Sequence, residues 1–412
     1  MSDPSSLSPS PDKEGRGSVP LLFGLTSLFA DMTYELAHVL LPQMMIAFGG
    51  GALSTALMES LAEGTRMGGF LVSGRLGGPP RTEAALVRGG YGLTVLSTVL
   101  MGAAASSGAL IGLKSLSWFG KGLRGPARDA LLSNALPPEL HAKAFGTVRG
   151  LDQVGGLLGP LIALSLSGLL SPAHILFVAV LPGLLCMGFS VIATRRAVLK
   201  RLAPLPASAA SSGSGSGLLS GVMSLPGIRT FLLGGTLLRA GTLPATLLMF
   251  RFASEGGSFP VTVAGFLLSS LLTVLANIAI VKGLLPRSPR TLMGIAAPLI
   301  ALSALMLAPR GAHPAAYILA MMAWGAGEAC ATVGLKVRGA ALWAPEFRSR
   351  GFALFEISAA LLSLLLWPAL SHLWDIGETG LGMGIAALSA AVGGAVLLWG
   401  GKSPKSPGVQ NP

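Results

Sequence analysis

The chain has 412 residues, of which 51% are hydrophobic and only 11% are charged. Soluble proteins carry about 25% charged residues, so a soluble protein of two or three domains and a disordered chain are both excluded. Two cysteines in all exclude a disulfide-rich scaffold. The net charge of +12 alone would suggest nucleic-acid binding, but the positions of the charges, described below, do not support it. With a mean hydropathy of +0.69, the composition predicts a polytopic membrane protein.

Apolar segments long enough to cross a bilayer recur along the whole chain. Each crossing needs about 20 predominantly apolar residues. Twelve such segments lie at 19–41, 53–73, 86–106, 109–132, 144–170, 174–194, 229–251, 261–282, 291–309, 314–337, 349–373 and 381–400. We therefore predict an all-α membrane protein with twelve transmembrane helices. Residues 1–18 are polar and rich in Ser and Pro, which predicts a disordered cytoplasmic N-terminus and no cleavable signal.

Basic residues predict the orientation, because cytoplasmic loops of membrane proteins are enriched in Lys and Arg. If the N-terminus is inside, the outer loops hold only Arg251 and Arg310. The cytoplasmic segments hold Lys13, Arg16, Arg75, Arg81, Arg88, Lys143, Arg195, Arg196, Lys200, Arg201, Arg229, Lys282, Arg287, Arg290, Arg348, Arg350, Lys402 and Lys405. We predict a multi-pass protein of the inner (plasma) membrane with both termini cytoplasmic. Its basic residues then face lipid headgroups, and no nucleic acid is expected.

The chain divides into two similar halves. A Ser- and Gly-rich cytoplasmic linker at 195–228 separates a six-helix half at 19–194 from a second at 229–401, and a cytoplasmic tail follows at 402–412. Residues 138–146 (PELHAKAFG) parallel residues 345–353 (PEFRSRGFA) at an offset of 207. Pro160 and Pro368 follow at an offset of 208, each in the fifth segment of its half. Two parallel halves of this kind are one known transporter architecture.

Charged residues inside the apolar segments mark the candidate functional site. A charge at bilayer depth costs about 2.5–3.5 kcal/mol, so it is expected to face protein or a water-filled cavity. The third, sixth, ninth and twelfth segments carry no Asp, Glu, Lys or Arg once Arg88 is counted with the cytoplasmic residues. That pattern predicts neutral, lipid-facing helices around a polar central passage.

The first segment carries Asp31, Glu35 and His38 on one helical face, at i, i+4 and i+7. A carboxylate that changes partner between conformations couples proton movement to transport, so these residues are candidates for the proton-coupling and substrate cavity. Glu328 and Glu356 are the corresponding candidates in the second half. Because oxygen and nitrogen donors share this face, a divalent metal is a further possibility.

A second group of charges is predicted to form ion pairs that either lock the helices together or gate the passage. Arg149 and Asp152 are i, i+3 neighbours. Arg124 and Arg128 can pair with Asp129, or with Asp152 across a helix contact. Both interpretations stay open at this stage.

Four short sequence segments resemble the major facilitator superfamily. More narrowly, they resemble a bacterial branch of it that is described only in general terms, as transporters. They are Ser27-Leu-Phe-Ala-Asp31, Gly120-Lys-Gly-Leu-Arg-Gly-Pro-Ala-Arg-Asp-Ala130, Pro137-Pro-Glu139 and Arg149-Gly-Leu-Asp152. The resemblance extends from about residue 20 to 400. It implies twelve helices in two pseudo-symmetric halves, and it does not name a substrate.

The resemblance also assigns individual positions. In the loop motif between the second and third helices, the usual aspartate falls on Gly78, the following basic residue on Pro79 and a later glycine on Arg81. The motif is therefore eroded, and with it the salt bridge of the inner gate. The basic residue that the superfamily places in its fourth helix falls on Lys114, which the resemblance links to proton transfer.

The fifth helix is similar to the antiporter motif of the superfamily. It contains Gly155, Gly159 and Pro160, although the closing Gly-Gly of the motif is Ala163-Leu164 here. The small residues permit close helix contact, and the proline permits a bend. Plain glycine-rich packing is the alternative interpretation.

We predict a secondary active transporter that moves a small organic solute by alternating access, with proton-coupled export favoured. A divalent metal-ion exporter similar to ferroportins, with Asp31 and His38 as ligands, is one alternative. A membrane sensor or assembly protein is another. No Walker A, G-x-S-x-G, HExxH or dinucleotide motif is present, so no enzyme and no cofactor is predicted, and neither is a resident metal. The expected partners are the solute, protons and lipid, and the expected state is a monomer.

Overall fold

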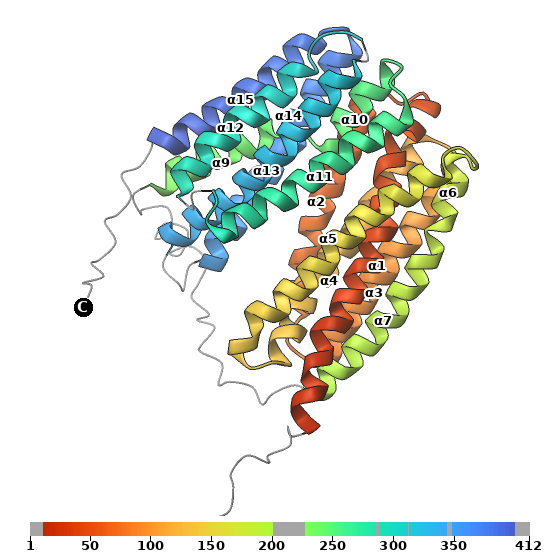
Figure 1. Ribbon diagram of the computed structural model, residues 1–412, viewed down its shortest axis with the longest axis vertical. Coiled ribbons are helices and arrows are strands. Elements are labelled where there is room, and N and C mark those ends of the chain that lie inside the picture. The colour runs from red at the N-terminus through yellow and green to blue at the C-terminus, as the bar shows by residue number, and fades with distance from the viewer. Residues whose placement is uncertain (1–10, 201–226, 286–287, 312, 344–347, 400–412) are drawn as a thin grey trace, which may run out of the picture. The chain divides into compact units, whose positions relative to one another are not determined.

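The computed structural model describes residues 11–200, 227–285, 288–311, 313–343 and 348–399. Residues 1–10, most of the predicted linker and the predicted tail lie outside these ranges. Within them, every regular element is a helix (Figure 1). The chain divides into two compact units. The N-terminal unit comprises the described residues up to 200 with Ser258–Val263, and the C-terminal unit comprises the others.

The N-terminal unit is built from six long helical paths. Its helices are α1 (Pro11–Ala47), α2 (Ala52–Leu76), α3 (Pro80–Leu100), α4 (Ser107–Asn134), α5 (His141–Leu166), α6 (Pro172–Val178) and α7 (Val180–Leu199), with 3₁₀ turns at Met101–Ala103 and Pro138–Leu140. α1 begins inside the segment that we assigned to the N-terminal tail. A proline at its first position fits this start, because the first turn has no use for that amide donor.

The C-terminal unit repeats the plan. Its helices are α9 (Ile228–Gly241), α10 (Ala245–Ser254), α11 (Phe259–Lys282) from Ala264 onward, α12 (Pro289–Met306), α13 (Pro314–Leu342), α14 (Arg348–Asp375) and α15 (Thr379–Trp399). α9 and α10 together occupy the predicted seventh segment, which is therefore interrupted at Thr242–Pro244. The sequence analysis treated that segment as one continuous helix.

Twelve membrane-spanning helices are confirmed. Among the described residues, eight spans are long and apolar enough to cross a membrane, with α6–α7 and α9–α10 each forming one span. The remaining four are the long helices α1, α2, α4 and α5. These four contain most of the charges that the sequence places at membrane depth, which is why their mean hydropathy is lower. The chain is a multi-pass membrane protein.

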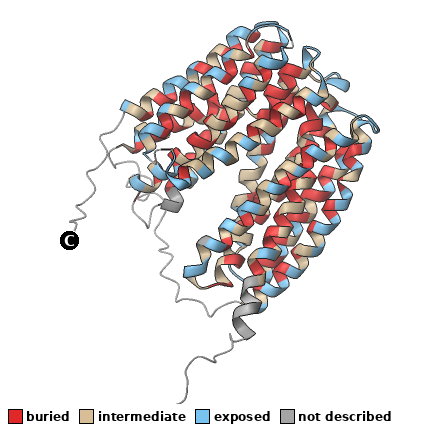
Figure 2. Ribbon diagram, viewed as in Figure 1, coloured by how far each residue is buried: buried red, intermediate tan, exposed pale blue. Residues whose placement is uncertain are grey.

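Each unit has its own apolar core. In the N-terminal unit α1 packs against α5 and α7, and α4 packs against α2 and α3. In the C-terminal unit α9 packs most closely against α15, and α12 against α13. Buried and exposed residues are mixed along the long helices (Figure 2), whereas α10 is buried from Ala245 to Phe252. Exposed leucines are frequent on α7, α12 and α15, as expected for lipid-facing surfaces.

One hydrogen bond recurs at equivalent places in the two units and supports the internal repeat. Thr65 on α2 donates from Oγ1 to the carbonyl of Ser115 on α4, at 2.8 Å. Thr273 on α11 donates in the same way to Gly325 on α13, at 3.0 Å. The two threonines are 208 residues apart (273 minus 65), which is the offset between Pro160 and Pro368. Both prolines lie inside their helices, α5 and α14.

Candidate functional site

The three polar residues of α1 lie at the contact between α1, α4 and α5. Asp31 is 6% exposed, and Glu35 and His38 are half-buried. The Nδ1 of His38 lies 3.9 Å from Oε2 of Glu35. Asp31 is within hydrogen-bonding reach of Tyr34 on its own helix and of Asp152 on α5, and the charge of Lys121 on α4 acts on it. The predicted face of α1 thus meets charged residues from two other helices.

The neighbouring carboxyl groups of Asp31 and Asp152 form the most unusual feature of this contact. Ionised carboxylates only accept hydrogen bonds, so a hydrogen bond between two of them requires one proton. Asp152 also accepts from Nη1 of Arg149 at 2.7 Å, while the Arg149 side chain is 73% exposed. The i, i+3 pair predicted from the sequence is therefore present. The two carboxyl groups thus lie near each other, with Lys121 on one side and Arg149 on the other.

Aromatic rings line the cationic side of the same contact. Nζ of Lys121 lies 4.0 Å from the ring centroid of Tyr34 and 5.1 Å from that of Trp118. Tyr34 and Trp118 meet edge to face at 5.7 Å. A cation over an aromatic face is stabilised by the ring quadrupole, most strongly where water is excluded. The rings hold Lys121 beside Asp31 without neutralising its charge.

Lys114 has a partner that the sequence analysis did not identify. Its Nζ lies 3.4 Å from Oε1 of Glu59 on α2 and 3.6 Å from the ring centroid of Trp118. The side chains of Lys114 and Glu59 are only 1% and 9% exposed. Glu59 was visible in the sequence as a charge in the second apolar segment, but nothing there indicated which cation it meets. The two residues form a buried ion pair between α2 and α4.

The predicted ion-pair network separates into two parts. Arg124 donates to Oγ1 of Thr94 at 2.7 Å and lies over the ring of Tyr91. Arg128 bonds Ser27 on α1 and its neighbour Asp129, both at 3.0 Å. Asp152 instead belongs with Arg149 and Asp31. Arg124 and Arg128 therefore connect α4 to α3 and α1, and hydroxyl groups satisfy much of their hydrogen bonding.

In the C-terminal unit, the candidate Glu328 forms an ion pair with Arg239. Nη1 of Arg239 on α9 lies 2.6 Å from Oε1 of Glu328 on α13, and Thr332 donates to the same oxygen at 3.1 Å. The side chains of the pair are 34% and 21% exposed. Glu356 is half-buried on α14 and has no ion pair among the described residues. The structure therefore brings together Arg239 and Glu328 but leaves Glu356 apart.

Gly155 and Gly159 bring the backbones of α5 and α1 together. A Cβ atom at Gly155 would lie 2.2 Å from the carbonyl oxygen of Leu28, and one at Gly159 would lie 2.7 Å from the backbone of α1. Pro160 follows as a buried residue inside α5. The two glycines are thus required for the close approach that keeps Asp152 beside Asp31.

The loop between α2 and α3 contains an acid that the motif comparison missed. Glu83, only 5% exposed in the first turn of α3, accepts a hydrogen bond from the backbone N–H of Gly78 at 3.2 Å. Gly78 adopts a φ of 120°, which favours glycine. A carboxylate here also interacts well with the helix N-terminus. Gly78 thus occupies the position of the motif's usual aspartate, and a buried glutamate follows five residues later.

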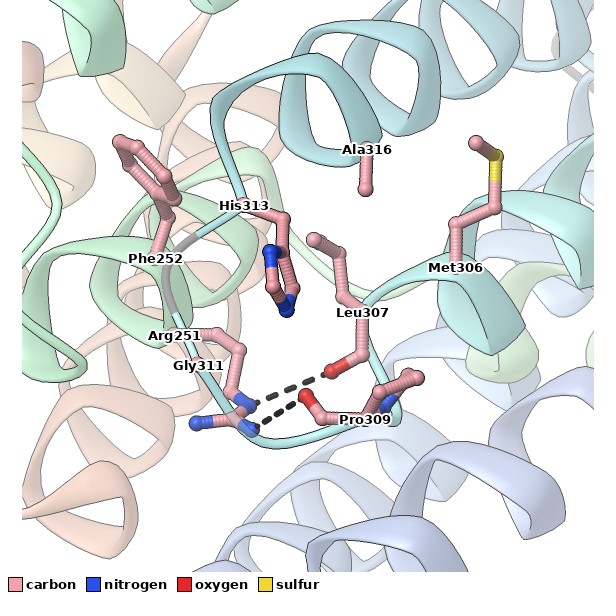
Figure 3. A pocket seen from close by; sticks show the side chains of 8 residues that line it. All are labelled: Arg251, Phe252, Met306, Leu307, Pro309, Gly311, His313 and Ala316. Atoms are coloured by element: carbon pink, nitrogen blue, oxygen red, sulfur yellow. Dashed lines mark hydrogen bonds between the residues drawn. The ribbon is translucent and has the colours of Figure 1, made fainter.

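Arg251 lies in a small pocket at the end of α10 (Figure 3). The sequence analysis counted it with the outer loops, but it is inside α10 and 5% exposed. It donates to the carbonyls of Leu307 and Pro309 at 3.2 and 2.9 Å and pairs with Glu255. The cavity measures about 80 Å³, well below the roughly 300 Å³ at which sites for organic ligands begin. Arg251 thus anchors the α12–α13 loop.

No group of three or more His, Cys, Asp or Glu side chains with metal-binding geometry occurs within the part of the chain that the structure describes. The proposed ligands Asp31 and His38 therefore have no third partner of this kind there. Cys186 and Cys330 are buried free thiols.

Comparisons with known proteins agree with this architecture. No family model matches the chain. An uncharacterized protein of Mycobacterium tuberculosis is 33% identical over 164 residues, which are 39% of this chain and 40% of that protein. An uncharacterized MFS-type transporter of Methanocaldococcus jannaschii is 33% identical over 153 residues, 37% of this chain and 38% of that protein. Each match spans about two fifths of the relative.

Among solved structures, the nucleoside transporter NupG matches with a TM-score of 0.69 at 14% identity, over 92% of this chain and 98% of that one. A mutant form of the peptide transporter POT gives 0.71 at 15%, over 95% and 98%. A bacterial homologue of the human lysosomal transporter Spinster gives 0.62 at 13%, over 95% of each chain. The predicted fold class is confirmed: the chain has the all-helical major facilitator fold of these structures.

Proposed function

Given this fold, we propose that the chain is a secondary transporter which moves a small organic solute across the inner membrane by alternating access and exports it in exchange for protons. The observation that carries the proposal is the carboxyl pair of Asp31 and Asp152, with Lys121 beside it. Ionisable groups at membrane depth are functional-site candidates, because a purely structural role would rarely offset their cost.

The coupling step follows from the charges of these three residues. With one proton shared between the two carboxyl groups, Lys121 balances the single remaining negative charge. Loss of that proton leaves two carboxylates, whose mutual repulsion favours their separation. A conformational change that moves α5 relative to α1 separates them. The protonation state of the pair therefore biases which conformation is stable, and this links proton movement to alternating access.

Two further features support the direction and orientation. The α1–α5 contact through Gly155 and Gly159 is similar to the antiporter motif, which favours export. The distribution of basic residues favours cytoplasmic termini. Lys114, Glu35 and His38 belong to the proton-coupling group of the N-terminal unit in this proposal, and Glu328 and Glu356 are the candidates within the C-terminal unit. A monomer is sufficient for this mechanism.

The test begins with the solute. A thermal-shift screen of the purified protein identifies ligands, since binding raises apparent stability by mass action. Nucleosides and short peptides are the first sets to screen, because transporters with this fold are named for them. Transport of a hit is then measured in proteoliposomes under an imposed pH gradient. We expect the gradient to drive transport in the wild type.

Asp31→Asn is expected to abolish this response to the gradient while downhill movement of the solute continues. Glu139→Gln, which changes an exposed acid before α5, serves as the control and should behave as the wild type does. Transport that ignores the gradient, or a normal response in Asp31→Asn, would show that coupling does not run through the carboxyl pair.

A further inference from the structure

The interruption of the seventh span leaves backbone carbonyls without their usual donors. In a continuous helix the carbonyl of Ala240 accepts from the amide of residue 244, but Pro244 has no N–H. The carbonyl of Leu243 would accept from Leu247, whose N–H instead donates to Pro244 at 2.9 Å. An unsatisfied carbonyl at membrane depth costs several kcal/mol, so each requires another donor.

Two tryptophans supply these donors. Nε1 of Trp367, on α14, donates to the carbonyl of Ala240 at 2.9 Å. Nε1 of Trp324, on α13, donates to the carbonyl of Leu243 at 2.8 Å. Each indole thus replaces one amide that the break removes. Because the donors come from different helices, the end of α9 is fastened to α14, and Leu243, two residues before α10, is fastened to α13.

The break is also next to the ion pair of the C-terminal unit. Arg239 precedes Ala240 directly, and its partner Glu328 lies one helical turn after Trp324 on the same face of α13. The backbone that Trp324 and Trp367 hold is therefore the backbone that directs Arg239 toward Glu328. A change of angle at Thr242–Pro244 would alter this pair.

We propose that Trp324 and Trp367 are positioning residues for transport: their indole N–H groups hold the break at Thr242–Pro244 at one angle and place Arg239 against Glu328. Release of either indole allows the break to act as a hinge. The inference rests on the proposed function only in that transport requires a conformational change. It does not depend on the solute or on proton coupling.

The experiment measures the bend directly. Both native cysteines are replaced by Ala, and spin labels are attached through Arg229→Cys and Ser254→Cys, which are exposed positions at the two ends of the interrupted span. Both labels lie in the C-terminal unit, so their distance reports the bend and not a movement between units. Double electron–electron resonance in nanodiscs then gives the distance distribution without any solute.

Trp324→Phe and Trp367→Phe remove the N–H groups and keep an aromatic ring. We expect each to change the ratio of bent to straightened populations about threefold to tenfold, the factor that corresponds to one hydrogen bond. Trp374→Phe is the matched control, because Trp374 is buried in the same unit and its Nε1 has no hydrogen-bond partner among the described residues. Its distribution should equal that of the starting protein.

A second pair of variants tests the replacement of the missing amide. Pro244→Ala restores an N–H that can reach Ala240, so adding Trp367→Phe to it should change the distribution no more than the control does. Trp324→His and Trp367→His retain a ring N–H and should lie between Phe and Trp, which separates hydrogen bonding from packing. The proposal is overturned if the Phe variants match Trp374→Phe, or if Trp367→Phe has its full effect in the Pro244→Ala background.

Discussion

The two units share one plan of helices but stabilise it by different means. In the N-terminal unit, Lys114, Lys121 and Arg124 lie inside the bundle, where they meet Glu59, aromatic rings and hydroxyl groups. In the C-terminal unit the described membrane part contains the ion pair of Arg239 with Glu328 and indole-to-carbonyl bonds around an interrupted helix.

The first helix of each unit is also packed differently. α1 is continuous and meets the backbone of α5, whereas α9 is short and meets the backbone of α15 through Gly234 and Gly393. The comparison indicates that the two units of a repeated fold can differ in how their helices are stabilised. We interpret the N-terminal unit as the part that handles charge and the C-terminal unit as the part that bends.

The largest expected effect tests the buried charge of the N-terminal unit. Lys114→Met leaves Glu59 as a buried, uncompensated charge, so we expect a loss of about 3–5 kcal/mol of stability. The double variant Lys114→Met with Glu59→Gln should recover most of that loss, because neither charge remains. Thermal unfolding of the detergent-solubilised protein measures both.

A matching substitution in the C-terminal unit extends the comparison. Arg239→Met should cost less than Lys114→Met, because both side chains of its pair are more exposed than those of Lys114 and Glu59. Equal losses from Lys114→Met and Arg239→Met would contradict the view that buried charge distinguishes the units. So would a double Lys114/Glu59 variant no more stable than the single one.

A smaller effect tests the packing of the first helix of each unit. Gly155→Ala would place a methyl group 2.2 Å from the carbonyl of Leu28, and Gly393→Ala one 2.5 Å from the amide of Leu238. Overpacking of this kind costs about 1–3 kcal/mol. We expect both variants to lower the melting temperature.

Neighbouring glycines provide the controls for these substitutions. A methyl group at Gly156 on α5 or at Gly384 on α15 meets nothing within 4 Å, so alanine there should be neutral or slightly stabilising, since it favours the helix. If Gly155→Ala and Gly156→Ala melt alike, the α1–α5 contact is not as close as described. A loss at Gly155 without one at Gly393 would remove the α9–α15 half of the comparison.

The features that the sequence predicted are local or periodic. Twelve apolar segments follow from hydropathy, the pair of Arg149 and Asp152 follows from helical spacing, and Pro160 with Pro368 follows from the repeat. The major facilitator fold was implied by the resemblance of short sequence runs to that superfamily. Each of these depends on residues near one another in the chain or on a regular offset.

The features that it missed depend on which helices are neighbours. Glu59 and Lys114 lie on different helices, and Arg239 and Glu328 are 89 residues apart, so no spacing rule connects either pair. The interruption at Pro244 was missed because a proline in an apolar segment is compatible with a kinked helix as well as with a broken one. The role of Trp324 and Trp367 was also missed, because an indole N–H finds its acceptor only where the interrupted helix leaves carbonyls exposed.

The smallest expected effect concerns the end of α10, where the C-terminal unit places a charge pair outside the membrane part. The hydrogen bond from Arg251 holds the pKa of Glu255 below its ordinary range, and the backbone N–H of Gly311 contributes. A lowered pKa in the folded state means that the pair stabilises the protein above the pKa of the unfolded carboxyl group, about 4.3. The stabilisation is lost as the pH falls through the folded-state value. Glu255→Gln should therefore lower the free energy of unfolding slightly at pH 7, by less than about 1 kcal/mol for so exposed a group, and the difference from the wild type should shrink as the pH falls. Glu378→Gln, at an exposed acid between α14 and α15, is the control.

A difference in stability between the wild type and Glu255→Gln that persists unchanged at low pH would show that Glu255 acts through packing. The contrast between buried charge in the N-terminal unit and peripheral charge in the C-terminal unit would then lose its electrostatic basis.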